Sequence, residues 1–204
     1  GYDGSTAIPV LVGLHGRGDT PKDFIHADYQ TLADQLNIAF VAISGVVPTG
    51  KNSFAWATDP KTNVAHVNKV LTQLFRAEKI KPGKMALFGF SQGAQVLLQL
   101  EVAESDKWSG AIAMSPGLFP AASLVPVSGK QPSLSHQRYL ITNGEKEYPA
   151  NLNLAKADLD ELKQMGALPK QLLYPDMGHS FPPDYYKQLP RWAANALQLN
   201  DKPE

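Results

Sequence analysis

Short apolar segments alternate along the chain with longer segments whose apolar residues recur at helical spacing. The centres of the short segments are apolar on both faces, as buried parallel strands require. These strand candidates are Val10–Leu14, Ala39–Ser44, Lys84–Phe88, Ser109–Met114, Arg138–Thr142 and Gln171–Tyr174. The helix candidates are Phe24–Leu36, Val64–Glu78, Gln92–Glu104, Ala150–Met165 and Asp184–Leu199. This alternation predicts an α/β fold with a mostly parallel central sheet and helices on both faces.

Length and composition narrow the class of protein. The 204 residues suit a single domain, residues 1–204, and the 43% hydrophobic content is globular rather than disordered. No apolar run reaches the roughly 18 residues of a membrane span. Lys plus Arg equals Asp plus Glu at 19 each, so no net charge favours nucleic acid or anionic lipid as a partner. The absence of cysteine excludes disulfide scaffolds, thiolate zinc sites and cysteine nucleophiles.

The compartment and the oligomeric state stay open. The sequence begins with Gly1. It is compatible with a cytoplasmic protein, and also with a secreted or periplasmic one whose signal peptide was removed before Gly1.

The pentapeptide Gly89–Gly93 has the pattern G-x-S-x-G, with Ser91 at its centre. An apolar strand candidate directly precedes it and a helix candidate directly follows it. A chain that turns so sharply from strand to helix holds its central serine in strained backbone angles above the sheet. We therefore predict that Ser91 is a nucleophile.

A glycine-rich loop follows the first strand candidate, with the sequence His15-Gly16-Arg17-Gly18-Asp19. Such a loop brings backbone N–H groups close to a substrate carbonyl. The predicted oxyanion hole consists of the N–H groups of Arg17 and of Gln92, the residue after Ser91. We expect His15 to anchor this loop through its ring rather than act as a base, and Asp19 to brace it.

A serine nucleophile of this kind needs a base from the loop after the last strand. The chain has five histidines: His15, His26, His66, His136 and His179. His179 follows the last strand candidate directly and is the predicted base. His26 and His66 fall on helix candidates and are expected to face solvent, while His136 is the remaining rival.

The acid that orients the base belongs in the loop after the preceding strand candidate, at Asn143–Pro149. Glu145 and Glu147 both qualify by position. Asp158 and Asp160, on the following helix candidate, are the alternatives.

Together these motifs resemble the acyl-protein thioesterase and carboxylesterase (phospholipase/carboxylesterase) group of α/β-hydrolases. The resemblance runs through Leu14–Thr20, Gly89–Gly93, Met114–Pro120 and Gly178-His179. The family's acid stands three residues after a glycine, which falls here on Glu147, a glutamate in place of the usual aspartate. The same elbow makes the chain similar to polyester depolymerases and feruloyl esterases.

The resemblance implies a compact α/β-hydrolase without a large lid domain. It implies a Ser91–His179–Glu147 triad that cleaves small-molecule esters or thioesters through an acyl-enzyme, with no cofactor and no metal. A peptidase or amidase on the same fold, or a non-catalytic binding protein, are the alternatives.

Four apolar side chains next to these motifs are predicted to line the substrate site: Trp56, Leu118, Phe119 and Phe181. Leu118 and Phe119 lie in Ser115–Gln137, a proline-rich segment with little periodicity. We expect that segment to be a long loop across the carboxyl edge of the sheet, where open α/β sheets bind ligands.

Overall fold

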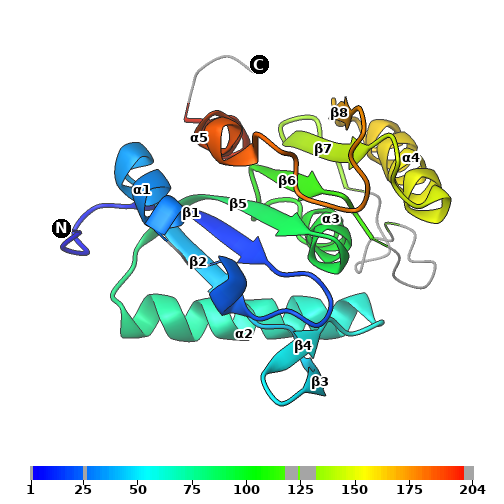
Figure 1. The fold of residues 1–204 in the computed structure, drawn as a ribbon. Coiled ribbons are helices and arrows are strands. Elements are labelled where there is room, and N and C mark those ends of the chain that lie inside the picture. Colours follow the sequence, from blue (N-terminus) through cyan, green and yellow to red (C-terminus); the bar gives the residue numbers. More distant parts are fainter. Residues whose placement is uncertain (1, 25–26, 118–123, 125–131, 200–204) are drawn as a thin grey trace.

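The computed structural model describes residues 2–24, 27–117, 124 and 132–199 (Figure 1). A six-stranded sheet lies at its centre, and every neighbouring pair of strands is parallel. The strands in spatial order are β2 (Ala39–Ile43), β1 (Ile8–Leu14), β5 (Pro82–Phe90), β6 (Gly110–Met114), β7 (Arg138–Gly144) and β8 (Lys170–Tyr174). The predicted parallel sheet is confirmed.

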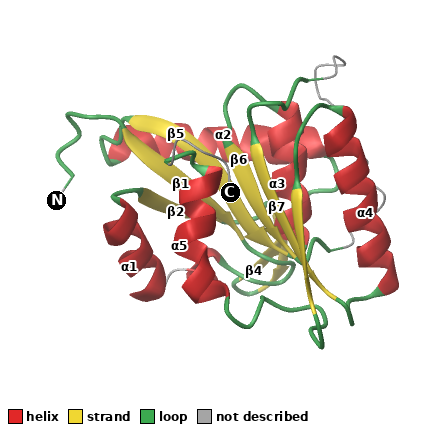
Figure 2. Ribbon diagram, turned by 90° about the horizontal axis from the view of Figure 1, so that it is seen from above, coloured by secondary structure: helices red, strands yellow, loops and turns green. Residues whose placement is uncertain are grey.

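Helices cover both faces of the sheet, as the sequence predicts (Figures 1 and 2). One face packs against α2 (Pro60–Ala77), α3 (Gln92–Ala103) and α4 (Pro149–Gln164), and the other against α1 (Ala27–Leu36) and α5 (Tyr185–Ala196). Side chains of the central strands alternate between the two cores, so Val10 and Val12 face the α2–α4 layer and Leu11 faces α1 and α5. None of the helices in the described ranges is long and apolar enough to cross a membrane.

The strand order places a topological switch point between β1 and β5. The chain runs from β1 outward to β2, then returns past β1 to form β5. The helix after β1 packs on one face and the helix after β5 packs on the other. Open α/β sheets bind ligands at such a switch point, where the two connections diverge.

Two helix starts differ from the sequence prediction. Phe24 belongs to η1 (Pro21–Phe24), a short 3-10 turn, and is buried against Phe88, so α1 begins only at Ala27. Helix α2 begins at Pro60, earlier than predicted, because the Asp59 carboxylate accepts hydrogen bonds from two N–H groups of its first turn. The apolar pattern used for prediction starts one turn later.

A hairpin of β3 (Val47–Gly50) and β4 (Ser53–Ala55) escaped the sequence analysis. Strand β3 is exposed along its length and contains a proline, so it lacks an apolar pattern. The hairpin holds the glycine-rich loop: Gly18 N–H donates to the Phe54 carbonyl at 2.8 Å, and Phe54 N–H donates to the Asp19 carbonyl at 3.0 Å.

A buried polar pair joins α3 to α4. The Gln95 side-chain amide donates to Asp158 Oδ1 at 3.1 Å, while Gln95 Oε1 and Asp158 Oδ2 are buried without a hydrogen bond. Burial raises the pKa of the Asp158 carboxyl from 3.8 to about 7, and the nearby Glu161 charge adds to this effect. A protonated carboxyl has an O–H donor that the ionised carboxylate lacks.

We expect Asp158→Asn to stabilise the fold at pH 8 by on the order of 1–4 kcal/mol. The folded state holds the Asp158 proton more tightly than the unfolded chain, so this residue's contribution to stability falls as pH rises from about 4 to about 7. An asparagine carries the donor at every pH. Urea unfolding of both proteins at pH 5 and pH 8 measures the effect, and an equal difference at both pH values would contradict it.

Candidate active site

Ser91 lies at the turn from β5 to α3, with φ 54° and ψ −119°. Its N–H donates to the Met114 carbonyl at 3.0 Å, which ties the turn to the end of β6. A Cβ on Gly93 would lie 2.1 Å from the Leu14 carbonyl oxygen, so only glycine fits where α3 crosses β1. Ser91 therefore lies at the carboxyl end of β5, at the switch point between β1 and β5.

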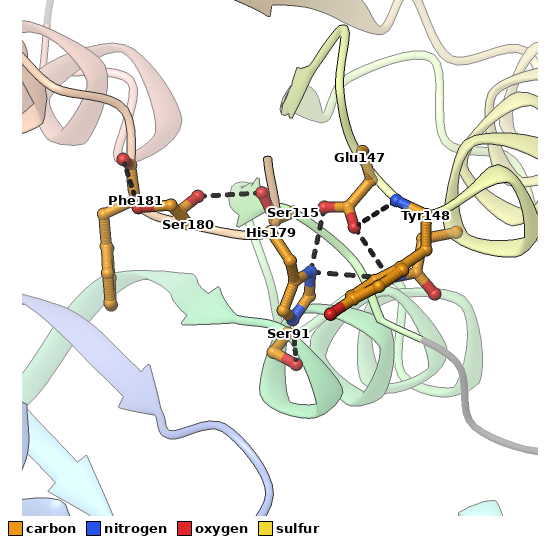
Figure 3. Close-up of polar contacts among 8 residues, drawn as sticks. Ser91, Ser115, Glu147, Tyr148, His179, Ser180 and Phe181 are labelled. Carbon is orange, nitrogen blue, oxygen red and sulfur yellow. Dashed lines mark hydrogen bonds and ion pairs between the residues drawn. The ribbon is translucent and has the colours of Figure 1, made fainter. Parts of the chain in front are cut away.

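His179 joins Ser91 to Glu147 through its two ring nitrogens (Figure 3). Its Nε2 lies 2.8 Å from Ser91 Oγ, and its Nδ1 lies 2.8 Å from Glu147 Oε2. A carboxylate only accepts, so this arrangement suits Nδ1–H donating to Glu147 and a free Nε2 lone pair facing the hydroxyl. Such a chain of hydrogen bonds can remove the serine proton and stabilise the resulting imidazolium.

Only 4% of Glu147 is exposed. Its second carboxylate oxygen is also held by hydrogen bonds. Glu147 Oε1 accepts the Tyr148 N–H at 2.8 Å and the Asn151 side-chain amide at 3.1 Å. Asn151 lies in the first turn of α4, and sequence analysis missed it. Its position four residues after Glu147 is the signal that points to it.

Hydrogen bonds between loops set the histidine in place. The Ser115 hydroxyl donates to the Ser180 carbonyl at 2.8 Å, next to His179. Lys146 N–H donates to the Met177 carbonyl at 2.9 Å, which joins the loop after β7 to the loop after β8. The first contact fixes Ser115 beside the loop after β8, while most of the predicted long loop Ser115–Gln137 lies outside the described residues.

The glycine-rich loop passes beside Ser91. Gly16 lies next to Ser91, since a Cβ on Gly16 would lie 3.5 Å from the Ser91 Cβ. Arg17, the next residue of the loop, therefore also lies near Ser91. The Arg17 side chain is exposed. His15 is buried, its Nδ1 donates to the Gly16 carbonyl at 2.7 Å, and its Nε2 accepts from Gly45 N–H at 2.9 Å. The anchoring role expected of His15 is confirmed, and burial lowers its pKa, which keeps the ring neutral.

Trp56 links the two halves of the predicted oxyanion hole. Its indole N–H donates to the His15 carbonyl and its backbone N–H donates to Gln92 Oε1, both at 2.9 Å. Only 2% of Trp56 is exposed. Trp56 was expected to line the substrate site. Its indole instead supports the glycine-rich loop and offers no open face to a substrate.

The rival residues lie elsewhere. His136 precedes β7, at the opposite edge of the parallel sheet from Ser91. His66 was expected to face solvent, but it is half-buried, and its Nε2 lies 2.8 Å from the Ser44 carbonyl oxygen. Glu145 and Asp160 are exposed, and Asp158 pairs with Gln95. His26 lies outside the described residues.

Aromatic rings and a glycine surround the reacting groups. Phe181 stacks on Phe90 with ring centroids 4.2 Å apart, and Phe90 lies 5.2 Å from the His179 ring. A Cβ on Gly117 would lie 2.8 Å from Ser91 Oγ, so the backbone of Gly117 packs directly against Ser91 and only glycine fits there. The predicted pocket residues Leu118 and Phe119 lie outside the described residues. Among the described residues, no three His, Asp or Glu side chains gather as a metal site needs.

Comparison with known sequences identifies relatives. A model of the phospholipase/carboxylesterase family matches residues 55–192, a range that contains Ser91, Glu147 and His179. NocK of Nocardia uniformis subsp. tsuyamanensis, a protein named as an esterase candidate, is 28% identical over 118 residues. That alignment covers 55% of this chain and 34% of NocK, so the chain spans about a third of the curated relative's length.

Solved structures share the fold. The Bacillus cereus carboxylesterase matches with a TM-score of 0.73 and 17% identity, over 93% of this chain and 89% of that chain. A carboxylesterase from Mesorhizobium loti matches with a TM-score of 0.71 and 18% identity, over 91% and 88%. A phospholipase/carboxylesterase from Dyadobacter fermentans DSM 18053 gives 0.69 and 21%, over 94% and 92%. These matches confirm the α/β-hydrolase fold.

Proposed function

Because the chain belongs to the phospholipase/carboxylesterase family of α/β-hydrolases, we propose that it hydrolyses carboxylic esters or thioesters through a Ser91–His179–Glu147 triad. The observation that carries the proposal is the pair of 2.8 Å contacts that join the three side chains in series. A serine with no such base is a weak nucleophile at neutral pH, so this contact chain is what acyl transfer requires.

Acylation begins when Ser91 Oγ attacks the substrate carbonyl carbon and its proton passes to His179 Nε2. The N–H groups of Gln92 and Arg17 stabilise the developing oxyanion, and Trp56 supports both segments. The buried Glu147 carboxylate stabilises the imidazolium. When the tetrahedral intermediate collapses, the carbon–oxygen or carbon–sulfur bond breaks and the leaving alcohol or thiol takes the proton from Nε2.

Deacylation repeats these steps with water. His179 Nε2 removes a proton from the water molecule that attacks the acyl-Ser91 carbonyl. The same oxyanion groups act again, and collapse releases the acid and returns the proton to Ser91 Oγ. The protein supplies the nucleophile, the base and the oxyanion donors from its own residues.

A panel of p-nitrophenyl esters with acyl chains of two carbons and upward tests the proposal. We expect saturable hydrolysis with a preference for short or medium chains, because Gly117 packs against the nucleophile and aromatic rings lie beside His179. Failure to hydrolyse any ester or thioester of the panel would contradict the proposed function.

Asn151→Ala is expected to lower kcat about tenfold with little change in KM. The Glu147 carboxylate loses one of its two hydrogen bonds at Oε1, and the net value of such a bond is about 1–2 kcal/mol. Asn153→Ala is the matched control, because Asn153 lies on the same helix and is exposed. Steady-state kinetics that show equal kcat for both variants would contradict the positioning role of Asn151.

A further inference from the structure

Tyr148 is the large aromatic residue that stands open beside the triad histidine. Its exposed fraction is 66%, although its ring centroid lies only 5.9 Å from that of His179. Figure 3 shows the tyrosine ring beside the His179 imidazole, which itself lies between Glu147 and Ser91. An exposed aromatic ring gains free energy when a ligand covers it, and this one lies where a ligand reacts.

The backbone of Tyr148 is rigidly held. Its N–H donates to Glu147 Oε1 at 2.8 Å, and its carbonyl accepts from Asn151 N–H at 2.9 Å and Leu152 N–H at 3.1 Å. Pro149 follows it and restricts its ψ, which is 132°. The ring therefore extends from a fixed point, and covering it costs little ordering of the chain.

The other aromatic residues near His179 pack against one another and are half-buried. Phe181 stacks on Phe90 at 4.2 Å and on Tyr185 at 5.0 Å, and it also meets Phe24 at 6.0 Å. These rings pack against the core under α1 and α5. Tyr148 differs because its ring has an open face.

The mechanism places the leaving group near this ring. The departing oxygen takes its proton from His179 Nε2, so it lies within hydrogen-bond reach of that atom. The carbon skeleton of the alcohol starts there, beside the imidazole, and a planar group attached to that oxygen can reach the Tyr148 ring. The acyl group stays on Ser91, next to Gly117.

We propose that Tyr148 is the binding platform for the alcohol portion of the substrate, and that the preferred substrates are esters of aromatic alcohols. This inference rests on the proposed serine-esterase function and names its substrate class. Stacking of a planar alcohol on Tyr148 lowers the barrier to acylation, the step in which the alcohol is still attached. Deacylation is independent of Tyr148 stacking, because the alcohol has then left.

The test compares kcat/KM for phenyl acetate and ethyl acetate in matched variants. Both esters carry the same acetyl group, so the ratio cancels effects on the nucleophile and the oxyanion donors. Weaker proton donation by His179 would raise the ratio, because ethoxide needs that proton more than phenoxide does. Tyr148→Ala should lower the phenyl-to-ethyl ratio about threefold to tenfold relative to the wild type. Tyr148→Phe should keep the ratio within twofold, because it keeps the ring. Leu168→Ala, which changes an exposed side chain of the loop before β8, is the surface control.

The outcomes separate this inference from the function on which it rests. An unchanged ratio in Tyr148→Ala, with both esters hydrolysed by the wild type, overturns the platform and leaves the esterase intact. An equal fall for both esters also overturns it, because Tyr148 then acts only through Glu147 and His179. If the wild type hydrolyses neither ester, the proposed function itself fails.

Discussion

Ser91→Ala should lower kcat for ester hydrolysis by about a millionfold and leave the fold intact. The substitution removes the atom that forms the covalent bond, together with its 2.8 Å contact to His179 Nε2. Alanine keeps the Cβ at φ 54°, so the strain of the turn is the same in both proteins. Esterase assays under single-turnover conditions, with circular dichroism for the fold, measure the result.

The matched control is Ser135→Ala. Ser135 is exposed and precedes β7, at the opposite edge of the sheet from Ser91. Its loss should change kcat less than twofold. A Ser91→Ala protein that keeps a tenth of the wild-type kcat would show that another group is the nucleophile.

Glu147→Gln should lower kcat by about a thousandfold to ten-thousandfold, with little change in melting temperature. The glutamine amide fills the same volume but lacks the charge that stabilises the imidazolium. When the glutamine amide N–H donates to His179 Nδ1, the neutral ring carries its proton on Nε2. That nitrogen then cannot accept the proton of Ser91. Steady-state kinetics beside thermal unfolding of the same preparations measure both effects.

Glu145→Gln provides a control within the same loop. Glu145 is exposed, while only 4% of Glu147 is. We expect kcat of Glu145→Gln within twofold of the wild type. The reverse pattern would move the acid to Glu145, and near-wild-type activity in both variants would exclude this loop as the source of the acid.

The sequence predicts those parts of the fold and site that local pattern determines. The strands are recognisable because both faces are apolar, and Ser91 is recognisable because a glycine-flanked serine separates a strand from a helix. His179 follows from its place after the last strand. The order of these segments, without any contact information, also predicts that the loops after β1, β5, β7 and β8 meet at one edge.

Other features depend on contacts that sequence spacing does not specify. Glu145 and Glu147 differ by two positions in one loop, and the turn in which Glu147 N–H donates to the Gly144 carbonyl decides which one is buried. Trp56 looks like a pocket residue until its two hydrogen bonds place it under the glycine-rich loop. The β3–β4 hairpin has no apolar pattern because it is a support on the surface rather than part of the core.

The most direct test of the central claim is the mass of the protein after reaction with a fluorophosphonate, followed by peptide mapping. The account predicts one adduct per chain, on the hydroxyl of Ser91 within the peptide that contains Gly89–Gly93. His179→Ala and Glu147→Gln should label at least a hundredfold more slowly, since each disrupts activation of that hydroxyl. An unlabelled protein, an adduct on another residue, or undiminished labelling in both variants would contradict a Ser91–His179–Glu147 triad.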